Sequence, residues 1–394
     1  MAAVYQYSQE SAHVKRSVLR ELLRHAVDPN IISLATGLPS SELLPTRQFD
    51  ECVRTVIARD GASAMQYSPQ IMPLREWLAD YMTRRGVPSE AENIYITNGC
   101  QHNMSLLSRL FVNLGDTAVI EEITYVGVMQ ATGGHGAALR LVPSNLSTGV
   151  DIDALEAAFA QEPRPKLAIL IPDFHNPLGV SITPEKRQRA AQLANQYQVP
   201  LVEDDPYSPL RFIGEMPAPI KHYDTDGYVF YSGSFSKILA PGVRCGWIVA
   251  PVDVVRYIER LREADDLETS TLIQRSIYEF LRRGWLEEHL AQLNEANKIR
   301  RDTLLAALDT HLGSYATWTE PEGGIFVWVT LPEHINTWDM VKDAIDHQVI
   351  YVPGGEFSVN GGYKNTMRLN FSNVSVANLS EGIRRLGGVI QKYL

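Results

Sequence analysis

Tyr231-Ser-Gly-Ser-Phe-Ser-Lys237 is the stretch around which this 394-residue chain is organised, and it continues to Arg244. The apolar run Tyr228–Tyr231 predicts a buried strand, and small hydroxyl and glycine residues follow where that strand ends. One lysine and one arginine therefore come close together at a strand end. This pattern indicates an anion site that contains an amine.

The residue types in this stretch suit two different tasks. Ser234 and Ser236 can donate hydroxyl hydrogen bonds to phosphate oxygens, and Arg244 adds a permanently charged, forked contact. Lys237 is then free for chemistry, because a lysine that is partly desolvated beside a fixed cation has a lowered pKa and becomes a nucleophile. The alternative is a polar loop whose Lys237 and Arg244 face solvent.

Composition bounds the kind of protein. With 45% hydrophobic residues the chain can bury a large core, and its length favours one large and one small domain. The net charge is -10, and the lysines and arginines are scattered, which argues against a nucleic-acid or membrane surface and favours small-molecule substrates. We therefore expect a soluble protein that acts on small metabolites.

Cysteine usage and the N-terminus indicate a compartment. Cys52, Cys100 and Cys245 are odd in number and far apart, so we expect neither a disulfide framework nor a metal site. Residues 1–10 lack a basic region followed by an apolar run, so neither export nor membrane insertion is expected. These features predict a cytoplasmic location.

Alternating strand and helix patterns set the fold class. After residue 117, short apolar runs alternate with helical segments, which predicts an α/β fold with a mostly parallel central sheet covered by helices on both faces. A smaller α+β domain follows. We place the large domain at residues 46–286, and we assign residues 1–45 and 287–394 to an N-terminal arm and the small C-terminal domain.

Polar residues follow three of the predicted strands. Asn176 lies just after the first, Asp204 directly after the second, and Lys237 in the loop after the third. In such sheets ligands bind beyond the carboxyl ends of the strands, so these loops should converge. Each also has a structural alternative, because Asn-Pro and Asp-Pro are common turn formers.

Three further features point to ligand contacts. The strand, glycine turn and helix around Gly99, Cys100 and Gln101 can present backbone N–H groups and a helix dipole to an anion, or can be a turn without a ligand. Arg368 lies within an apolar strand, so it needs an anionic partner, which is either a structural carboxylate or a substrate carboxylate. Gly37 lies in a turn that allows a close backbone approach.

Together these motifs resemble the fold-type I pyridoxal-phosphate aminotransferases of class I/II, and in particular the α-aminoadipate and kynurenine aminotransferase branch. The resemblance covers nearly the whole chain in the expected order. The matching motifs are Ser17-Val-Leu-Arg20, Gly37-Leu-Pro39, Gln66-Tyr67-Ser68-Pro69, Thr97-Asn-Gly99-Cys-Gln101, Asn176-Pro177-x-Gly179, Glu203-Asp204-Asp205-x-Tyr207, Ser234-x-Ser236-Lys237 with Arg244, Gly323-Gly324-x-Phe326, Val352-Pro-Gly-Gly355 and Arg368-Leu.

The resemblance implies a role for each residue around the cofactor ring. Lys237 would form the Schiff base with pyridoxal 5'-phosphate and then move the α-proton of the substrate. Asp204 would pair with the pyridine nitrogen. Asn176 and Tyr207 would hydrogen-bond the phenolic oxygen, and Tyr125 would stack on the ring.

The resemblance also implies the remaining contacts. Arg368 would bind the substrate carboxylate, helped by Asn176 and the backbone at Gly37, and Arg20 would bind a distal carboxylate or else lie on a surface helix. The chain would form a homodimer with shared active sites, with no metal. The implied phosphate contacts are Gly99, Cys100, Gln101, Ser234, Ser236, Arg244 and, from a partner subunit, Tyr67.

The chain departs from the family pattern at a few positions. Cys100 stands where a serine usually donates to the phosphate. Leu178 replaces a small hydroxyl residue, and Phe174-His175 replaces the common residues before Asn176. We expect these substitutions to lie near the ring and the substrate.

The leading hypothesis is an aminotransferase that moves an amino group between an L-amino acid and a 2-oxo acid. One alternative is another pyridoxal-phosphate reaction on the same scaffold, namely decarboxylation, elimination or oxidation. A more remote alternative is a cofactor-sensing transcriptional regulator, but Met1 lies only a short distance before the first motif, so no DNA-binding module is expected.

Overall fold

A computed structural model describes residues 5–8, 11, 24 and 28–394. Arg20, the predicted contact for a distal carboxylate, lies outside these residues. Within them, no helix is both long and apolar enough to cross a bilayer.

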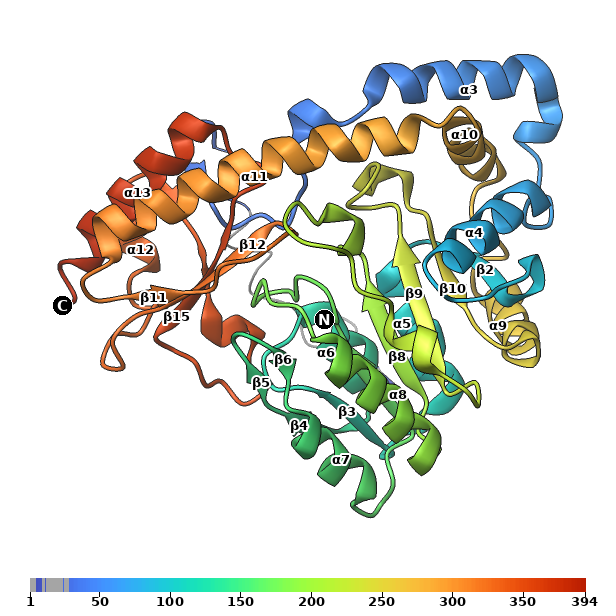
Figure 1. The fold of residues 1–394 in the computed structure, drawn as a ribbon, viewed down its shortest axis with the longest axis horizontal. Helices are drawn as coiled ribbons and strands as arrows, with labels where there is room; N and C mark the ends of the chain where they lie inside the picture. The colour runs from blue at the N-terminus through green and yellow to red at the C-terminus, as the bar shows by residue number, and fades with distance from the viewer. Residues whose placement is uncertain (1–4, 9–10, 12–23, 25–27) are drawn as a thin grey trace.

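A seven-stranded sheet forms the centre of the larger part of the molecule (Figure 1). Its strand order is β2-β10-β9-β8-β7-β3-β4, and only β10 runs antiparallel to its neighbours. The expected α/β fold with a mostly parallel sheet is therefore confirmed. The strands, in chain order, are β2 (Ile94–Thr97), β3 (Thr117–Glu121), β4 (Ala138–Val142), β7 (Leu167–Leu170), β8 (Leu201–Asp205), β9 (Val229–Ser234) and β10 (Gly246–Val249).

Helices cover both faces of this sheet because its strands are apolar on both sides. Tyr95 and Ile248 pack with helices α5, α6 and α9, whereas Ile96 and Trp247 pack toward α4 and α10, and α7 and α8 cover the same side farther along. The helices are α3 (Thr46–Asp60), α4 (Met72–Arg84), α5 (Cys100–Phe111), α6 (Val126–Thr132), α7 (Ile152–Ala160), α8 (Pro184–Tyr197), α9 (Val252–Asp265) and α10 (Thr271–Arg282).

A smaller sheet follows, with strand order β11-β12-β15-β14. Its apolar residues, such as Val327 and Leu369, pack with Leu308 and Ile383 of two helices. The elements are α11 (Trp285–Leu312), β11 (Thr317–Trp318), β12 (Phe326–Thr330), α12 (Val341–Asp346), β13 (Val349–Ile350), β14 (Val352–Pro353), β15 (Thr366–Asn370) and α13 (Val376–Ile390).

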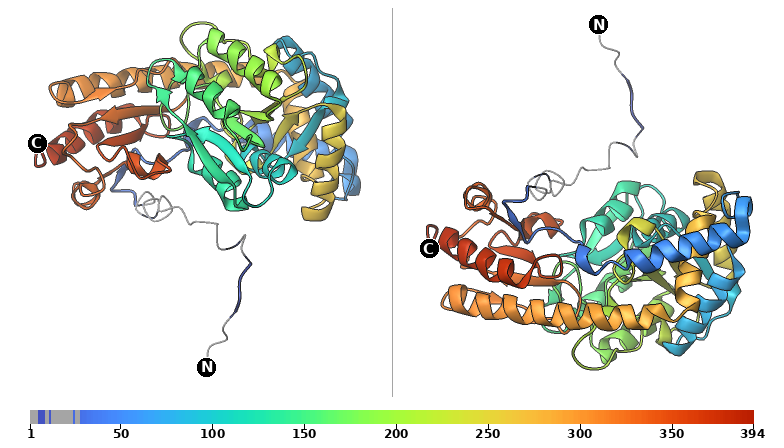
Figure 2. Two further views of the ribbon diagram at one scale, coloured as in Figure 1. Left: turned by 90° about the horizontal axis from the view of Figure 1, so that it is seen from below. Right: turned by 90° about the horizontal axis from the view of Figure 1, so that it is seen from above.

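The helix α11 and the short strand β1 (Ile32–Ser33) connect the larger and the smaller sheet regions. The long helix α11 runs along one side of the molecule from α10 to α13 (Figures 1 and 2). Near the N-terminus, β1 pairs in parallel with β13. The segment after β1 therefore lies beside β15, where Asn370 donates its amide to Leu34 O at 2.8 Å. A short hairpin of β5 (Ser144–Asn145) and β6 (Gly149–Val150) precedes α7.

Candidate active site

A cavity of about 360 Å³ lies beyond the carboxyl ends of β7, β8 and β9. The three polar strand ends predicted from the sequence meet there, together with the first turn of α5 and the segment after β1. Its lining residues are Thr36, Gly37, Leu38, Cys100, Gln101, Tyr125, Ile171, Asn176, Asp204, Pro206, Tyr207, Ser234, Ser236, Lys237, Pro241, Arg244 and Arg368.

Lys237 lies just beyond β9, and its Nζ donates a hydrogen bond to Gly37 O at 2.8 Å. Burial, together with the charges of Arg368 and Arg244, lowers its pKa to about 8. In the described residues no carboxylate pairs with this amine. The expected shift is therefore present, and Arg368 contributes more to it than the neighbour expected from the sequence, Arg244.

Asp204 is a buried carboxylate at the end of β8. Burial raises its pKa to about 6, whereas hydrogen bonds from Cys100 and Ser232 oppose this shift. The Ser232 hydroxyl donates to Asp204 Oδ1 at 3.1 Å. No lysine, arginine or histidine forms an ion pair with Asp204 in the described part of the chain, although the charge of His175, which pairs with Glu121, acts on it from farther away.

Anion-binding groups gather around the start of α5 and the end of β9. Ser234 Oγ donates to Ser236 Oγ at 2.9 Å, and Arg244 reaches across to Asn98 O at 2.7 Å. Gly99, which precedes α5, has a φ of 103°, and a Cβ there would lie 3.5 Å from both Arg244 Nη2 and Ser234 Oγ. The N–H groups at the start of α5 thus lie beside Arg244 and Ser234, and the positive φ of residue 99 favours glycine there.

Two predicted phosphate contacts point elsewhere. The Cys100 thiol lies 3.7 Å from Ser232 O, beside Asp204, so it faces the carboxylate rather than the serine cluster. Gln101 Nε2 donates to Gly127 O at 3.1 Å. Only the main-chain amides of Cys100 and Gln101 therefore remain as candidate donors to an anion at the start of α5.

Arg368 lies in β15, with only 2% of its surface exposed. Nη1 donates to Asn176 Oδ1 at 2.9 Å and Nη2 to Ala35 O at 2.6 Å, but the buried Nε has no partner. The rings of Phe326 and Phe357 lie 4.2 and 4.9 Å from its guanidinium carbon. No carboxylate in the described residues faces Arg368, so the structural-carboxylate alternative has no support.

The remaining predicted ring contacts also line the cavity. Tyr207 follows β8 and packs edge-to-face on Phe326, with ring centroids 6.1 Å apart, and Tyr125 immediately precedes α6. Burial raises the pKa of both phenols, so both remain protonated donors.

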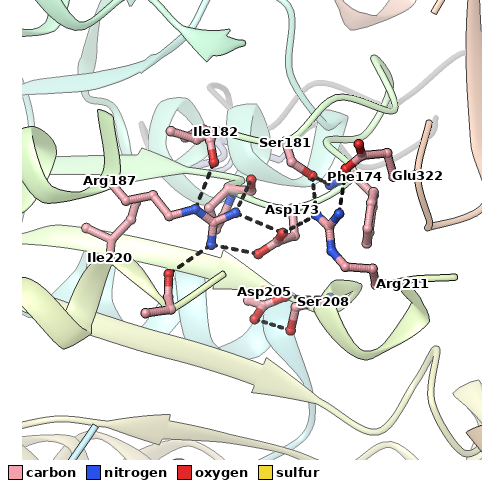
Figure 3. Close-up of polar contacts among 12 residues, drawn as sticks. Asp173, Phe174, Ser181, Ile182, Arg187, Asp205, Ser208, Arg211, Ile220 and Glu322 are labelled. Carbon is pink, nitrogen blue, oxygen red and sulfur yellow. Dashed lines mark hydrogen bonds and ion pairs between the residues drawn. The ribbon is translucent and has the colours of Figure 1, made fainter. Parts of the chain in front are cut away.

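The loop after β7 is held by a buried ion network outside the cavity (Figure 3). Arg187 donates to both oxygens of Asp173, at 2.9 and 2.8 Å, and Arg211 lies over the ring of Phe174 at 4.7 Å. Phe174 itself has a left-handed φ of 45°. This network fixes the loop that carries Asn176 into the cavity.

The substituted residues around Asn176 are buried and lie outside the lining of the cavity. Leu178 is fully buried against Ile350 and Trp328, and Phe174 and His175 are buried in the layer behind Asn176. None of the three lines the cavity. Their side chains therefore do not form the cavity wall, and the expectation that these substitutions lie near the ring and the substrate stays a prediction.

The structure adds cavity residues for which no role had been expected, although several of them lie inside the quoted motifs. They are mostly apolar, and they flank predicted residues in the chain: Thr36 and Leu38 on either side of Gly37, Ile171, Pro206 and Pro241. Proximity to a motif residue was the one signal that could have identified them.

Tyr67 does not reach this cavity. It is 86% exposed and lines separate surface hollows with Ser68, Pro69 and Gln70. Its position agrees with a contact to another molecule but does not test one.

The polar groups of the cavity that lack partners can be compared with the groups of pyridoxal 5'-phosphate. The cavity offers hydroxyls, a guanidinium and helix amides for a phosphate, and the unpaired carboxylate of Asp204 for a protonated ring nitrogen. The Lys237 amine lies in the same cavity, with a pKa near neutrality. The residues present therefore fit this cofactor.

Comparisons with known proteins agree with this chemistry. A model of the aminotransferase class I and II family matches residues 29–386. An aromatic-amino-acid aminotransferase of Thermococcus litoralis is 38% identical, over 98% of this chain and 94% of that protein. A 2-aminoadipate transaminase of Thermus thermophilus is 34% identical, over 98% and 97%.

A solved structure is similar over the same extent. The kynurenine aminotransferase of Pyrococcus horikoshii, in complex with PMP, superimposes with a TM-score of 0.93 at 35% identity, and the match covers 98% of this chain and 97% of that one.

Proposed function

The chain belongs to the class I and II aminotransferases, a family of pyridoxal-phosphate enzymes that transfer an amino group between an amino acid and a 2-oxo acid, and we propose that the cavity around Lys237 is its active site. One observation carries this proposal. An amine, a carboxylate without a cation and a guanidinium without a carboxylate converge in a single cavity.

Pyridoxal 5'-phosphate supplies, when bound, a carbonyl carbon that reacts with amines and a ring that withdraws electrons from the substrate α-carbon. Asp204 would be the residue for the ring nitrogen, because it is a carboxylate in the cavity lining that forms no ion pair in the described residues. The phosphate would be held by Ser234, Ser236, Arg244 and the amides after Gly99. Tyr207 and Asn176 would be the donors for the phenolic oxygen, and Tyr125 would contact the ring.

Lys237 anchors the cofactor and then acts as the base at the α-carbon. With a pKa of about 8, a substantial fraction of the amine is neutral near physiological pH, so it can accept a proton without a large energetic cost. Arg368 keeps this pKa low, and the same guanidinium is free to bind the substrate carboxylate. The group that binds the substrate carboxylate and the group that accepts the α-proton therefore lie in the same cavity.

We infer an L-amino acid donor with a large apolar or aromatic side chain. Leu38, Ile171, Pro206 and Pro241 give the cavity apolar walls, and the named activities of similar proteins involve aromatic amino acids, kynurenine and 2-aminoadipate. Decarboxylation, elimination and oxidation are not favoured by these comparisons.

We also propose a homodimer in the cytoplasm, with the large domain at residues 46–286. The 86% exposure of Tyr67 supports a dimer in which this side chain reaches the partner's phosphate site. The three free cysteines support a reducing compartment. Size-exclusion chromatography with light scattering tests the dimer.

The test of the proposed function is a titration of the cofactor-loaded enzyme with single amino acids, without any 2-oxo acid. The cofactor absorbance should convert to that of its amine form, with one equivalent of 2-oxo acid released per site, and Lys237→Ala should show no turnover. Release of ammonia, carbon dioxide or peroxide instead would assign another reaction to the same scaffold.

A further inference from the structure

A buried polar chain lies behind Asp204, outside the residues assigned above. Asn103 of α5 donates through Nδ2 to Ser232 Oγ at 2.9 Å, and Ser232 of β9 donates to Asp204 Oδ1 at 3.1 Å. Both Asn103 and Ser232 are fully buried. Ser232 lies within the stretch from Tyr231 to Lys237, but no role was expected for it or for Asn103.

The partners of Asn103 fix the direction of this chain. Its Nδ2 also faces two main-chain carbonyls, Gly233 O at 3.3 Å and Trp247 O at 3.0 Å, which can only accept hydrogen bonds. Its Oδ1 accepts from the Thr97 hydroxyl. The amide is therefore oriented with nitrogen toward Ser232, whose oxygen accepts and whose single proton is left to point at Asp204.

This direction matters because burial opposes the charge on Asp204. A directed hydroxyl stabilises the ionised carboxylate, and it leaves the oxygen that faces the cavity available. The titratable groups near Asp204 include Cys100 on α5, Asp205 next to it in β8, His175 after β7, Tyr125 before α6 and Tyr207 after β8. The thiol of Cys100 adds a second donor, whereas the charge of Asp205 opposes ionisation.

We propose that Asn103 and Ser232 are positioning residues, which hold the Asp204 carboxylate ionised and oriented toward the cofactor. Neither touches the cavity, so their effect passes through Asp204. This inference rests on the proposed role of Asp204 toward the ring nitrogen. It assigns a function to a side-chain pair on two elements that are far apart in the sequence.

The experiment measures the dissociation constant of pyridoxal 5'-phosphate from the apoprotein between about pH 5 and pH 9. Wild-type affinity should fall as the pH drops through about 6, where Asp204 takes up a proton. Ser232→Ala removes a hydrogen bond to the charged form, so this fall should move upward by about one pH unit. Asn103→Leu, a substitution of similar size, should move it in the same direction by less, because the serine keeps its proton.

A buried serine far from the site provides the matched control. Ser276 of α10 donates to Leu272 O at 2.7 Å, and Ser276→Ala should leave the pH profile unchanged. An equal loss of affinity at every pH in Ser232→Ala, with an unmoved profile, would overturn the inference and indicate a packing role. Asp204→Asn separates the two claims, because the phosphate of the cofactor itself titrates near about pH 6 in every variant. A profile in this variant that is identical to the wild-type profile contradicts the role of Asp204 itself.

Discussion

Arg187 and Arg368 are both almost completely buried, at 0% and 2% exposure, but only Arg187 faces a carboxylate. All five N–H hydrogens of Arg187 have acceptors. They are the two oxygens of Asp173 and the carbonyl oxygen of Ile182 (Figure 3), together with the carbonyl oxygens of Pro172 and Ala218. Arg368 has two neutral acceptors, two aromatic faces and an unpartnered Nε.

The protonation equilibria of these two arginines differ in the same way. Burial lowers the pKa of both guanidinium groups, but the charge and hydrogen bonds of Asp173 outweigh this for Arg187, whose pKa is raised. For Arg368 burial prevails, and the pKa falls to about 10. A buried charge with complete partners is structural, whereas one left incomplete beside a cavity indicates a place for a ligand.

The largest expected effect comes from Arg368→Ala. Without the guanidinium a substrate carboxylate enters the cavity unpaired, so kcat/KM for the amino donor should fall by about 10³-fold. Arg368→Lys keeps the charge but loses the fork, and should lose less. Steady-state kinetics measure both, and unchanged kcat/KM in Arg368→Ala would mean that the carboxylate binds elsewhere.

The second prediction concerns Arg187, the arginine whose hydrogen-bond partners are complete. Asp173→Asn leaves Arg187 buried without an anion, so the free energy of unfolding in urea should fall by about 3–5 kcal/mol. The double variant Asp173→Asn with Arg187→Met should lose less than the sum of the two single variants, because the isolated charge is gone. Additive losses would show that the pair is not coupled.

A smaller effect is expected at Lys237, which, like Arg368, has no carboxylate as an ion-pair partner in the described residues. Its folded pKa is about 8, against an ordinary value of 10.5, so the unfolded chain binds this proton more tightly and the charge destabilises the apoprotein below about pH 8. Lys237→Met should therefore stabilise the apoprotein at pH 7 by about 2 kcal/mol, allowing for water in the cavity.

The pH dependence provides the control for this third prediction. The advantage of Lys237→Met over wild type should shrink as the pH rises from about 8 toward 10.5, because the wild-type lysine then becomes neutral in both states. Urea denaturation at several pH values measures it. A constant advantage would indicate better packing of the methionine instead.

Much of the cavity could be predicted from residues at strand ends. The positions of Lys237, Asp204 and Asn176 in the cavity could be predicted, because parallel strands bring their carboxyl ends to one edge of the sheet. The orientation of the Cys100 thiol toward Asp204, and the burial of Leu178 behind Asn176, could not be predicted. Both depend on how one loop or helix end is rotated against its neighbours, and a rotation leaves no mark in residue spacing.

The sequence by itself determined the order of strands and helices, the chemical groups at the strand ends and the resemblance to a cofactor-dependent family. Only the tertiary structure decided which buried charges are paired, that Asp173 satisfies Arg187 while no described carboxylate meets Arg368, and that Asn103 and Ser232 stand behind Asp204. The physical reason is that periodicity and turn chemistry are local properties of a segment. Desolvation and ion pairing sum over groups from distant segments, and those are brought together only by folding.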